Sequence, residues 1–85
     1  MPDQEAPKVP NIPPTIPEVA LTLDVVYKMF LHAAKVESDE EHDQYTSAGL
    51  DLLYGIKKRC ETGGPMQVRM ETLQLLAQLN SQRPH

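Results

Sequence analysis

Two wide apolar stripes constrain this sequence more than any other feature. When residues 19–36 and 66–79 are wound as helices, apolar side chains occupy most of each circumference rather than one narrow face. A helix with that pattern is stable only when it is buried on more than one side. A chain of 85 residues has few other elements that could cover it. We therefore expect surplus apolar surface that a partner protein or a second copy of the chain covers.

Length and cysteine content set the size and the expected compartment. The chain is long enough for one small domain, and such a domain buries only about 60% of the surface of its unfolded chain. Cys60 is the only cysteine, so no internal disulfide can form, and a reducing compartment is expected. The opening residues MPDQEAPKVP combine acids with prolines, whereas a secretory signal needs basic and then apolar residues. We expect a cytoplasmic protein.

Charge and hydropathy argue against membranes and nucleic acids as partners. The formal charge is −4, whereas a phosphate-binding surface needs clustered lysines and arginines. Tryptophan is absent and phenylalanine occurs once, so aromatic platforms for single-stranded nucleic acid are lacking. No apolar run approaches the roughly 20 residues that span a bilayer. The sequence favours a protein partner.

The first helix is predicted over residues 16–37. Thr15 and Glu18 have the spacing of a capping box, and Pro17 suits the first turn, where its missing N–H costs little. Residues 21–25 alternate between apolar and other side chains and could form a strand. The longer 3.6-residue period that continues through Val36 outweighs this alternative.

Two further helices are predicted over residues 39–61 and 65–80. Ser38 and Glu41 repeat the capping-box spacing. Gly63 suits the left-handed residue that ends a helix, and Pro65 suits the first turn of the next one. Because both connections are short, the three helices are expected to lie antiparallel.

The ends of the chain are predicted to be disordered. Residues 1–14 form a proline-rich arm, residues 15–81 the helical interaction domain, and residues 82–85 a frayed tail. The overlapping spacing Pro7-x-x-Pro10-x-x-Pro13 could serve as a docking peptide for an aromatic groove. Lys8 lies too close to Pro10 for the usual basic-flanked register, so a solvated tail is the preferred interpretation.

Residues that could carry chemistry each have a simpler structural interpretation. His42 lies among the acids of residues 39–43, but the alternating ligands and the turn glycine of a calcium loop are absent. Cys60 falls on an apolar stripe near a helix C-terminus, where the dipole disfavours a thiolate, so a buried or half-buried thiol is expected. No carboxylate pair has the context of general acid–base catalysis. We expect no enzymatic activity, no cofactor and no bound metal.

Two alternative functions stay open. An acidic inhibitor that mimics nucleic acid would display the cluster Glu37, Asp39, Glu40, Glu41 and Asp43. That function needs a contiguous acidic face, and this chain has one short cluster. A helix-turn-helix protein would bring Gln67, Arg69 and Gln74 to base edges. The acidic charge and the apolar surround of the third helix weigh against DNA binding.

The interpretation that accounts for most of these observations is an all-α domain, an antiparallel helical hairpin plus a third helix, that works through contact with another protein. It would act as an adaptor, co-chaperone or regulator through the apolar faces of the first and third helices, or form a homodimer through the same surface. Three of the four methionines lie on these faces, where they suit either an adaptable binding surface or a core. The residues expected to contact the partner are Val25, Met29, Val36, Val68, Leu75 and Leu79.

Overall fold

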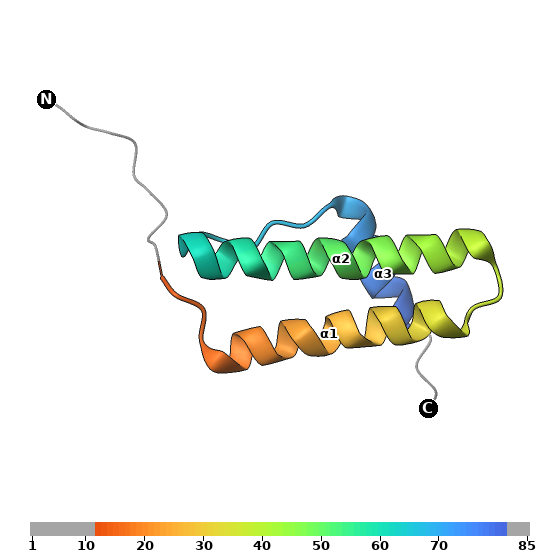
Figure 1. Ribbon diagram of the computed structural model, residues 1–85, viewed down its shortest axis with the longest axis horizontal. Coiled ribbons are helices and arrows are strands. Elements are labelled where there is room, and N and C mark those ends of the chain that lie inside the picture. Colours follow the sequence, from red (N-terminus) through yellow and green to blue (C-terminus); the bar gives the residue numbers. More distant parts are fainter. Residues whose placement is uncertain (1–11, 82–85) are drawn as a thin grey trace, which may run out of the picture.

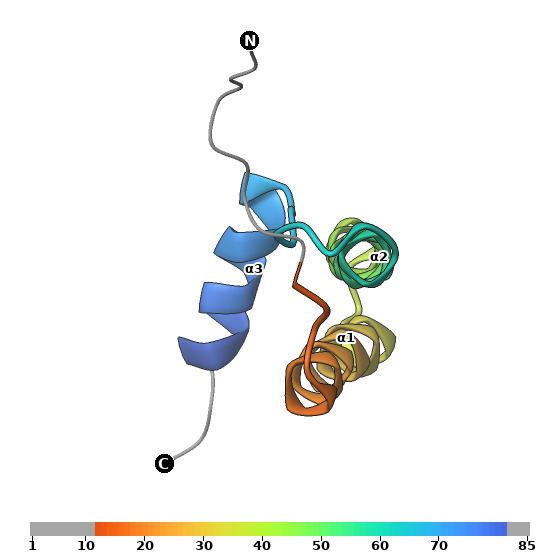
Figure 2. The same cartoon turned by 90° about the vertical axis from the view of Figure 1, so that its left-hand side faces the viewer.

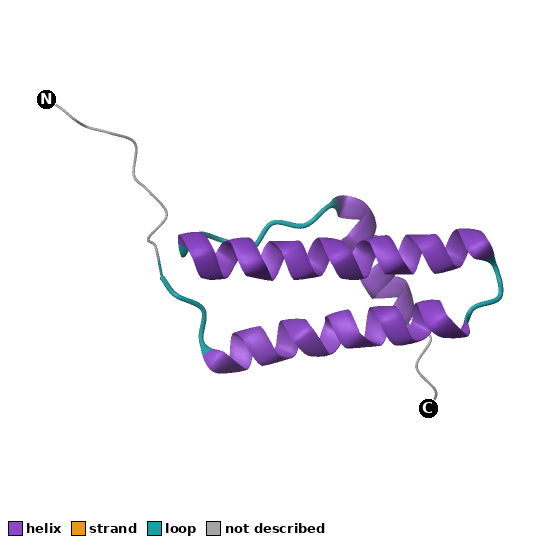
Figure 3. Cartoon of the chain, in the orientation of Figure 1, coloured by secondary structure: helices purple, strands orange, loops and turns teal. Residues whose placement is uncertain are grey.

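The computed structural model describes residues 12–81, and this part of the chain consists of three α-helices and their connections (Figure 3). Helix α1 spans Ile16–Lys35, α2 spans Asp39–Thr62 and α3 spans Met70–Ser81. No strand occurs among the described residues. The predicted all-α, three-helix class is therefore confirmed. Residues 1–11 of the arm predicted at 1–14, and the tail at 82–85, lie outside the described residues.

Helices α1 and α2 form the antiparallel hairpin that the sequence predicts, and they lie side by side along most of their length (Figure 1). Their facing sides make the core, which consists of Val26, Met29, Ala33, Tyr45, Ala48 and Leu52. The side chains of Met29 and Tyr45 are among the largest that are fully buried. The centre of the molecule is thus a seam between two helices, with a row of apolar side chains from each.

The hydroxyl half of each predicted capping box is present, whereas the Glu18 carboxylate binds Arg59 instead of the N–H of Thr15. The Thr15 hydroxyl accepts a hydrogen bond from the Glu18 N–H at 3.2 Å, and the Ser38 hydroxyl accepts one from the Glu41 N–H at 3.3 Å. These bonds satisfy donors that have no partner within the first turn of a helix. Gly63 ends α2 with φ 73° and ψ 1°, the left-handed conformation that glycine adopts without steric cost. Local sequence chemistry therefore determines where α1 and α2 begin and where α2 ends.

Helix α1 ends two residues before the predicted position, because Val36 is extended with φ −76° and ψ 151°. The Val36 N–H still donates to the His32 carbonyl, which closes the last turn. From the start of α2, His42 Nδ1 donates to the Ala33 carbonyl oxygen at 2.8 Å. The ring of His42 thus satisfies a carbonyl at the C-terminal end of α1, where such groups lack an intrahelical partner.

The third helix begins at Met70 and not at Pro65, so the predicted start is wrong. Residues 65–69 form neither helix nor strand and run beside α2 as a drawn-out connection, called the extended segment (Figure 1). The Arg69 N–H donates to Asp51 Oδ2 at 2.8 Å, and the Thr72 hydroxyl donates to the same oxygen at 2.7 Å. A carboxylate on α2 therefore binds the backbone just before α3 and a side chain in the first turn of α3. Because this anchor comes from a distant part of the sequence, the local pattern could not reveal it.

Helix α3 lies across one side of the α1–α2 hairpin and crosses both helices steeply (Figure 2). The antiparallel arrangement expected for all three helices is therefore right for α1 and α2 and wrong for α3. The extended segment 65–69 changes the chain direction and comes so close to α2 that a Cβ on Gly55 would lie 2.9 Å from the Gln67 carbonyl oxygen. The connection between α2 and α3, residues 63–69, is thus longer than the sequence predicts, and its packing against α2 allows α3 to leave in another direction.

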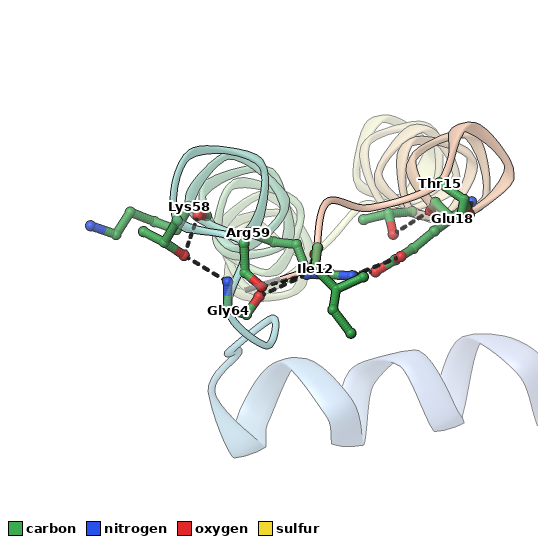
Figure 4. A network of polar contacts seen from close by, with 9 residues as sticks. Ile12, Thr15, Glu18, Lys58, Arg59 and Gly64 are labelled. Atoms are coloured by element: carbon green, nitrogen blue, oxygen red, sulfur yellow. Dashed lines mark hydrogen bonds and ion pairs between the residues drawn. The ribbon is translucent and has the colours of Figure 1, made fainter. Parts of the chain in front are cut away.

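Arg59 holds the N-terminal end of α1, the start of the described chain and the glycine turn together (Figure 4). Its guanidinium donates two hydrogen bonds to the Glu18 carboxylate, at 2.6 and 3.2 Å. It also donates to the carbonyl oxygens of Ile12, Gly63 and Gly64. The Ile12 N–H completes the link with a 2.9 Å bond to the Gly63 carbonyl oxygen. Ile12, which was predicted to belong to the disordered arm, is thus joined to the turn after α2.

The bond from Arg59 is also the main reason why the pKa of Glu18 is lowered below its ordinary value, since the bond stabilises the carboxylate. The pKa of Arg59 is raised for the same reason. Among residues 12–81, no helix combines the length and the apolar character needed to cross a bilayer.

Candidate functional site

An apolar groove opens where α3 crosses α1. Its volume is about 310 Å³. All three helices and the extended segment contribute to its wall, which consists of Leu21, Thr22, Val25, Leu52, Met66, Val68, Leu73 and Leu76. Leu52 is buried and forms the floor, whereas Leu21 and Leu73 are 69% and 47% exposed and form the rims. The groove therefore exists only because the third helix is docked on the hairpin.

The wall of the groove offers apolar contact and little else. Thr22 is its only polar residue, and the Thr22 hydroxyl donates to the Glu18 carbonyl within its own helix at 3.0 Å. No charged side chain lines the groove. An occupant would therefore gain binding energy from burying apolar surface and not from hydrogen bonds or ion pairs.

The structure brings together only some of the residues predicted to bind a partner. Val25 and Val68 both line the groove, from α1 and from the extended segment. Leu75 and Leu79 are half-buried and pack against the core from α3. Val36 is half-buried at the end of α1. The predicted set is thus spread over the groove, the inner side of α3 and the end of the hairpin.

Met29 was predicted to lie on an exposed apolar face, and the structure contradicts this placement. Its side chain is 0% exposed, in the seam between α1 and α2. Leu23 lies on the same apolar helix and is 44% exposed. Because apolar residues cover most of α1, periodicity alone could not show which side faces α2.

The groove also includes residues that were not predicted to belong to the binding surface, namely Leu21, Met66, Leu73 and Leu76. Met66, Leu73 and Leu76 belong to the wide stripe of the third predicted helix, so their apolar character was visible. Leu21 precedes the half-buried Thr22 by one residue and therefore points about 100° away from it around the helix. Only the place of α3 shows that this direction faces a neighbour.

A larger and more polar cleft lies beside the extended segment, with a volume of about 550 Å³. Asp51, Lys58 and Arg69 are among its lining residues. Burial raises the pKa of Asp51, but the bonds from the Arg69 N–H and the Thr72 hydroxyl and the charge of Arg69 outweigh this, so its pKa is lowered overall. The Arg69 guanidinium also donates to the Ser47 hydroxyl at 2.7 Å. These polar groups hold α3 against α2.

The remaining candidate residues for chemistry occupy structural or peripheral positions. Cys60 is exposed, which contradicts the predicted buried or half-buried thiol. The rings of His32 and Tyr45 meet edge to face, with their centroids 4.4 Å apart. Burial, with a smaller contribution from Glu41, raises the pKa of Tyr45. Across residues 12–81, no group of three or more histidine, cysteine, aspartate or glutamate side chains is placed to hold a metal ion.

Comparison with known proteins leaves the groove as the main guide to function. No known family, curated protein or solved structure matches this chain.

Proposed function

We propose that this protein is a non-enzymatic interaction module, an adaptor, co-chaperone or regulator, whose groove between α1 and α3 receives an apolar segment of a partner protein. The observation that carries the proposal is the chemistry of the groove. Its wall is apolar apart from one threonine whose hydroxyl is already bonded. Such a wall discriminates poorly among polar small molecules and suits large aliphatic or aromatic side chains.

The size of the groove limits what the partner can insert. A volume of about 310 Å³ is at the lower end of the range for pockets that hold a whole ligand. It accommodates two or three side chains of leucine or methionine size and leaves the rest of the partner outside. The partner segment is therefore a short helix with apolar residues three or four positions apart, which present themselves on one side. Met66 in the wall adds a flexible side chain that adapts to such residues.

The proposal is tested with a library of short peptides displayed on phage and selected against the full chain. Enriched peptides are expected to share apolar residues three or four positions apart and to bind in solution by isothermal titration calorimetry. Leu21→Glu and Leu73→Glu place a charge on each rim and are expected to weaken binding at least tenfold. Met70→Glu is the matched control, because Met70 is an exposed apolar residue of α3, at 65%, that does not line the groove.

Circular dichroism of each variant shows whether the fold is retained, since Leu21 and Leu73 are exposed and tolerate a charge. Methyl chemical shifts of Val25, Val68 and Leu76 are expected to move when a selected peptide is added. Peptides that bind the two rim variants as tightly as they bind the unchanged chain would refute the groove as the binding site. The groove would also be refuted if selection against the unchanged chain enriches the same peptides as selection against the Leu21→Glu, Leu73→Glu double variant.

A further inference from the structure

Helix α1 carries a second apolar row beside the one that it buries against α2. The buried row includes Val26, Met29 and Ala33. A shift of one residue turns the direction by about 100° around the helix. The row reached in this way, called the outer row of α1, consists of Ile16, Ala20, Leu23, Tyr27, Phe30 and Ala34. Its alternate spacings of four and three residues are those of a helix that packs lengthwise on another helix.

Helix α2 has a corresponding row, in which apolar residues stand beside two polar ones. Its buried row includes Tyr45, Leu52 and Ile56. The positions one residue further along form the outer row of α2, which consists of Thr46, Leu50, Leu53, Lys57 and Cys60. Leu50 is 56% exposed, and Leu23 and Tyr27 of α1 are 44% and 61% exposed. Large apolar side chains of both helices are thus left in contact with solvent.

The two outer rows lie on the side of the hairpin that faces away from α3. Positions one residue before the buried rows face α3 and the segment that leads into it, as Val25 of α1 and Asp51 and Gly55 of α2 show. Positions one residue after the buried rows therefore point to the opposite side. Figure 2 shows α3 on one side of the hairpin and none of residues 12–81 covering the other. This uncovered side is called the outer face.

We propose that a second copy of this chain covers the outer face, with a two-fold axis running across the helices so that each helix meets its own copy in the antiparallel direction. Facing rows of antiparallel helices interlock best when large residues meet small ones. An axis that crosses α1 between Tyr27 and Phe30 sets Leu23 against Ala34 of the second copy. The same axis sets Tyr27 beside Phe30 of the second copy, where aromatic rings form favourable edge and offset contacts.

One axis serves both helices. On α2, an axis between Leu50 and Leu53 sets Leu50 of one copy against Leu53 of the second copy, and Leu53 against Leu50. The Phe30 ring lies so close to Gly49 that a Cβ there would be 2.5 Å from it, and the rings of His32 and Tyr45 meet with their centroids 4.4 Å apart. These two contacts set the level of α1 against α2 and place the crossing points on the two helices within roughly one to three residues of each other, or about 1.5–4.5 Å along the helices. One axis therefore passes close to both crossing points.

The charges on α2 are complementary to their own copy in this arrangement. Asp43 lies toward the N-terminal end of α2 and Lys57 toward its C-terminal end, on either side of Leu50 and Leu53. Antiparallel pairing brings Lys57 to within one helical turn of Asp43 of the second copy, a distance that the lysine side chain spans. Lys57 already donates to Glu61 of its own helix, but an ammonium group has further donors to give. The two-fold symmetry produces the contact between Lys57 and Asp43 twice. A parallel pairing of the two α2 helices would instead set Asp43 beside Asp43 and Lys57 beside Lys57.

The area of the outer face agrees with a dimer of moderate affinity. Two helices about 30 Å long, packed about 9 Å apart, present a face that buries roughly 1,000–1,200 Å² in total when two copies meet. Specific interfaces begin at about this size. The dimer is therefore expected to dissociate on dilution, and its mass in solution is the direct measurement.

Sedimentation equilibrium of the full chain over a hundredfold range of concentration tests the proposal. The unchanged chain is expected to pass from monomer to dimer. Leu23→Glu and Leu50→Glu are expected to raise the dissociation constant at least tenfold, with helix content unchanged by circular dichroism because both side chains are exposed. Met70→Glu, on the other side of the molecule, is the matched control and is expected to dimerise like the unchanged chain.

A charge exchange tests the antiparallel direction. Asp43→Lys and Lys57→Glu each place like charges together in a dimer of identical copies, so each variant alone is expected to dimerise more weakly. An equimolar mixture restores both ion pairs. The lysine introduced at position 43 of one chain then meets the glutamate introduced at position 57 of the other, while the unchanged Lys57 meets the unchanged Asp43. Glu61→Gln controls for the loss of the pair that Lys57 makes within its own helix. A mixture no tighter than the two variants alone would exclude this pairing.

Two results would overturn the proposal as a whole. A chain that stays monomeric at the highest attainable concentration has no such dimer. If the dissociation constant of the dimer is unchanged by both Leu23→Glu and Leu50→Glu, the two copies meet through another surface. The groove and the outer face are tested by different residues, so peptide binding can fail while the dimer persists, and the dimer can fail while peptide binding persists.

Discussion

Asp51 joins parts of the chain that are far apart in the sequence. One of its carboxylate oxygens accepts hydrogen bonds from the Arg69 N–H and from the Thr72 hydroxyl, and Thr72 is fully buried. The carboxylate therefore satisfies the hydroxyl of the buried Thr72, which would otherwise lack a partner. Loss of the partner of a buried polar group costs more stability than loss of an exposed ion pair.

Replacing Asp51 with Asn is expected to lower the free energy of unfolding by about 1–3 kcal/mol, because bonds to a charged acceptor are lost. Urea unfolding followed by circular dichroism measures the change. Asp24→Asn is the matched control, since Asp24 pairs with Lys28 on the surface of α1 with both side chains more than half exposed. That change is expected to cost less than about 0.5 kcal/mol. Equal losses in the two variants would show that Asp51 does not hold α3.

The same carboxylate makes stability depend on pH. Its pKa is lowered in the folded protein, so the unfolded chain binds a proton more readily. The stability that Asp51 provides is therefore fully present above the ordinary aspartate pKa of about 4 and is lost as the pH falls through the lowered value. Thermal unfolding between pH 5 and pH 2 is expected to show a shallower decline for Asp51→Asn than for the unchanged chain. Parallel curves would contradict the assignment.

Gly55 shows that a residue can be required for the space that it leaves. A Cβ at this position would lie 2.9 Å from the Gln67 carbonyl oxygen, which belongs to the backbone and cannot turn away as a side chain would. Gly55→Ala gains about 1 kcal/mol of helix propensity but forces overpacking that costs about 1–3 kcal/mol, so a net loss is expected. Gly64→Ala is the control, because its Cβ would meet only Thr62 Oγ1 at 3.4 Å. Thermal unfolding of both variants gives the comparison, and a stabilised Gly55→Ala variant would show that residues 65–69 move freely.

Helices α1 and α2 are held together by a shared apolar seam. Helix α3 is held by polar bonds to Asp51 and by apolar side chains that pack against the hairpin. Leu52 belongs to both systems, since it lies in the core and also forms the floor of the groove. A side chain in such a position contributes to the hairpin and to the docking of the third helix. Its removal leaves a cavity that no single helix can close.

Leu52→Ala is accordingly expected to reduce the free energy of unfolding by about 2–5 kcal/mol. Leu31→Ala makes the same chemical change at an exposed position of α1 and is expected to cost less than about 0.5 kcal/mol. Denaturant titration of both variants gives the comparison. A loss below about 1 kcal/mol for Leu52→Ala would refute its place at the junction of the three helices.

At the scale of the whole molecule, the three helices differ in how firmly they are held. Helices α1 and α2 bury long facing rows, whereas Thr72 is the only fully buried residue of α3. Segments with few buried apolar contacts open locally at lower free energy than the core does. The groove is lost whenever α3 opens, so occupation of the groove and docking of α3 are coupled.

Native-state hydrogen exchange is expected to show lower opening free energies for the amides of α3 than for the central amides of α1 and α2. Asp51→Asn is expected to lower the values in α3 further and to leave those near Met29 and Tyr45 almost unchanged. A peptide that binds the groove is expected to raise protection in α3 in proportion to its occupancy. Equal protection of all three helices would mean that the molecule opens only as one unit.

The sequence by itself determined the class of the fold and most helix ends. Thr15, Ser38 and Gly63 act through bonds that span at most four residues, so their roles can be recognised without a tertiary structure. The apolar excess that implies a covered surface is likewise a property of composition and periodicity. These features are local, and local chemistry is what a sequence displays directly.

The tertiary structure alone decided which apolar residues are core and which form surfaces. Met29 and Tyr27 lie on one apolar helix, yet the first is fully buried and the second is largely exposed. That difference depends on where α2 and α3 pack. The start of α3 was set in the same way, by Asp51 on a different helix. An amphipathic pattern that is apolar nearly all round specifies burial but not its direction, and only packing between distant segments supplies the direction.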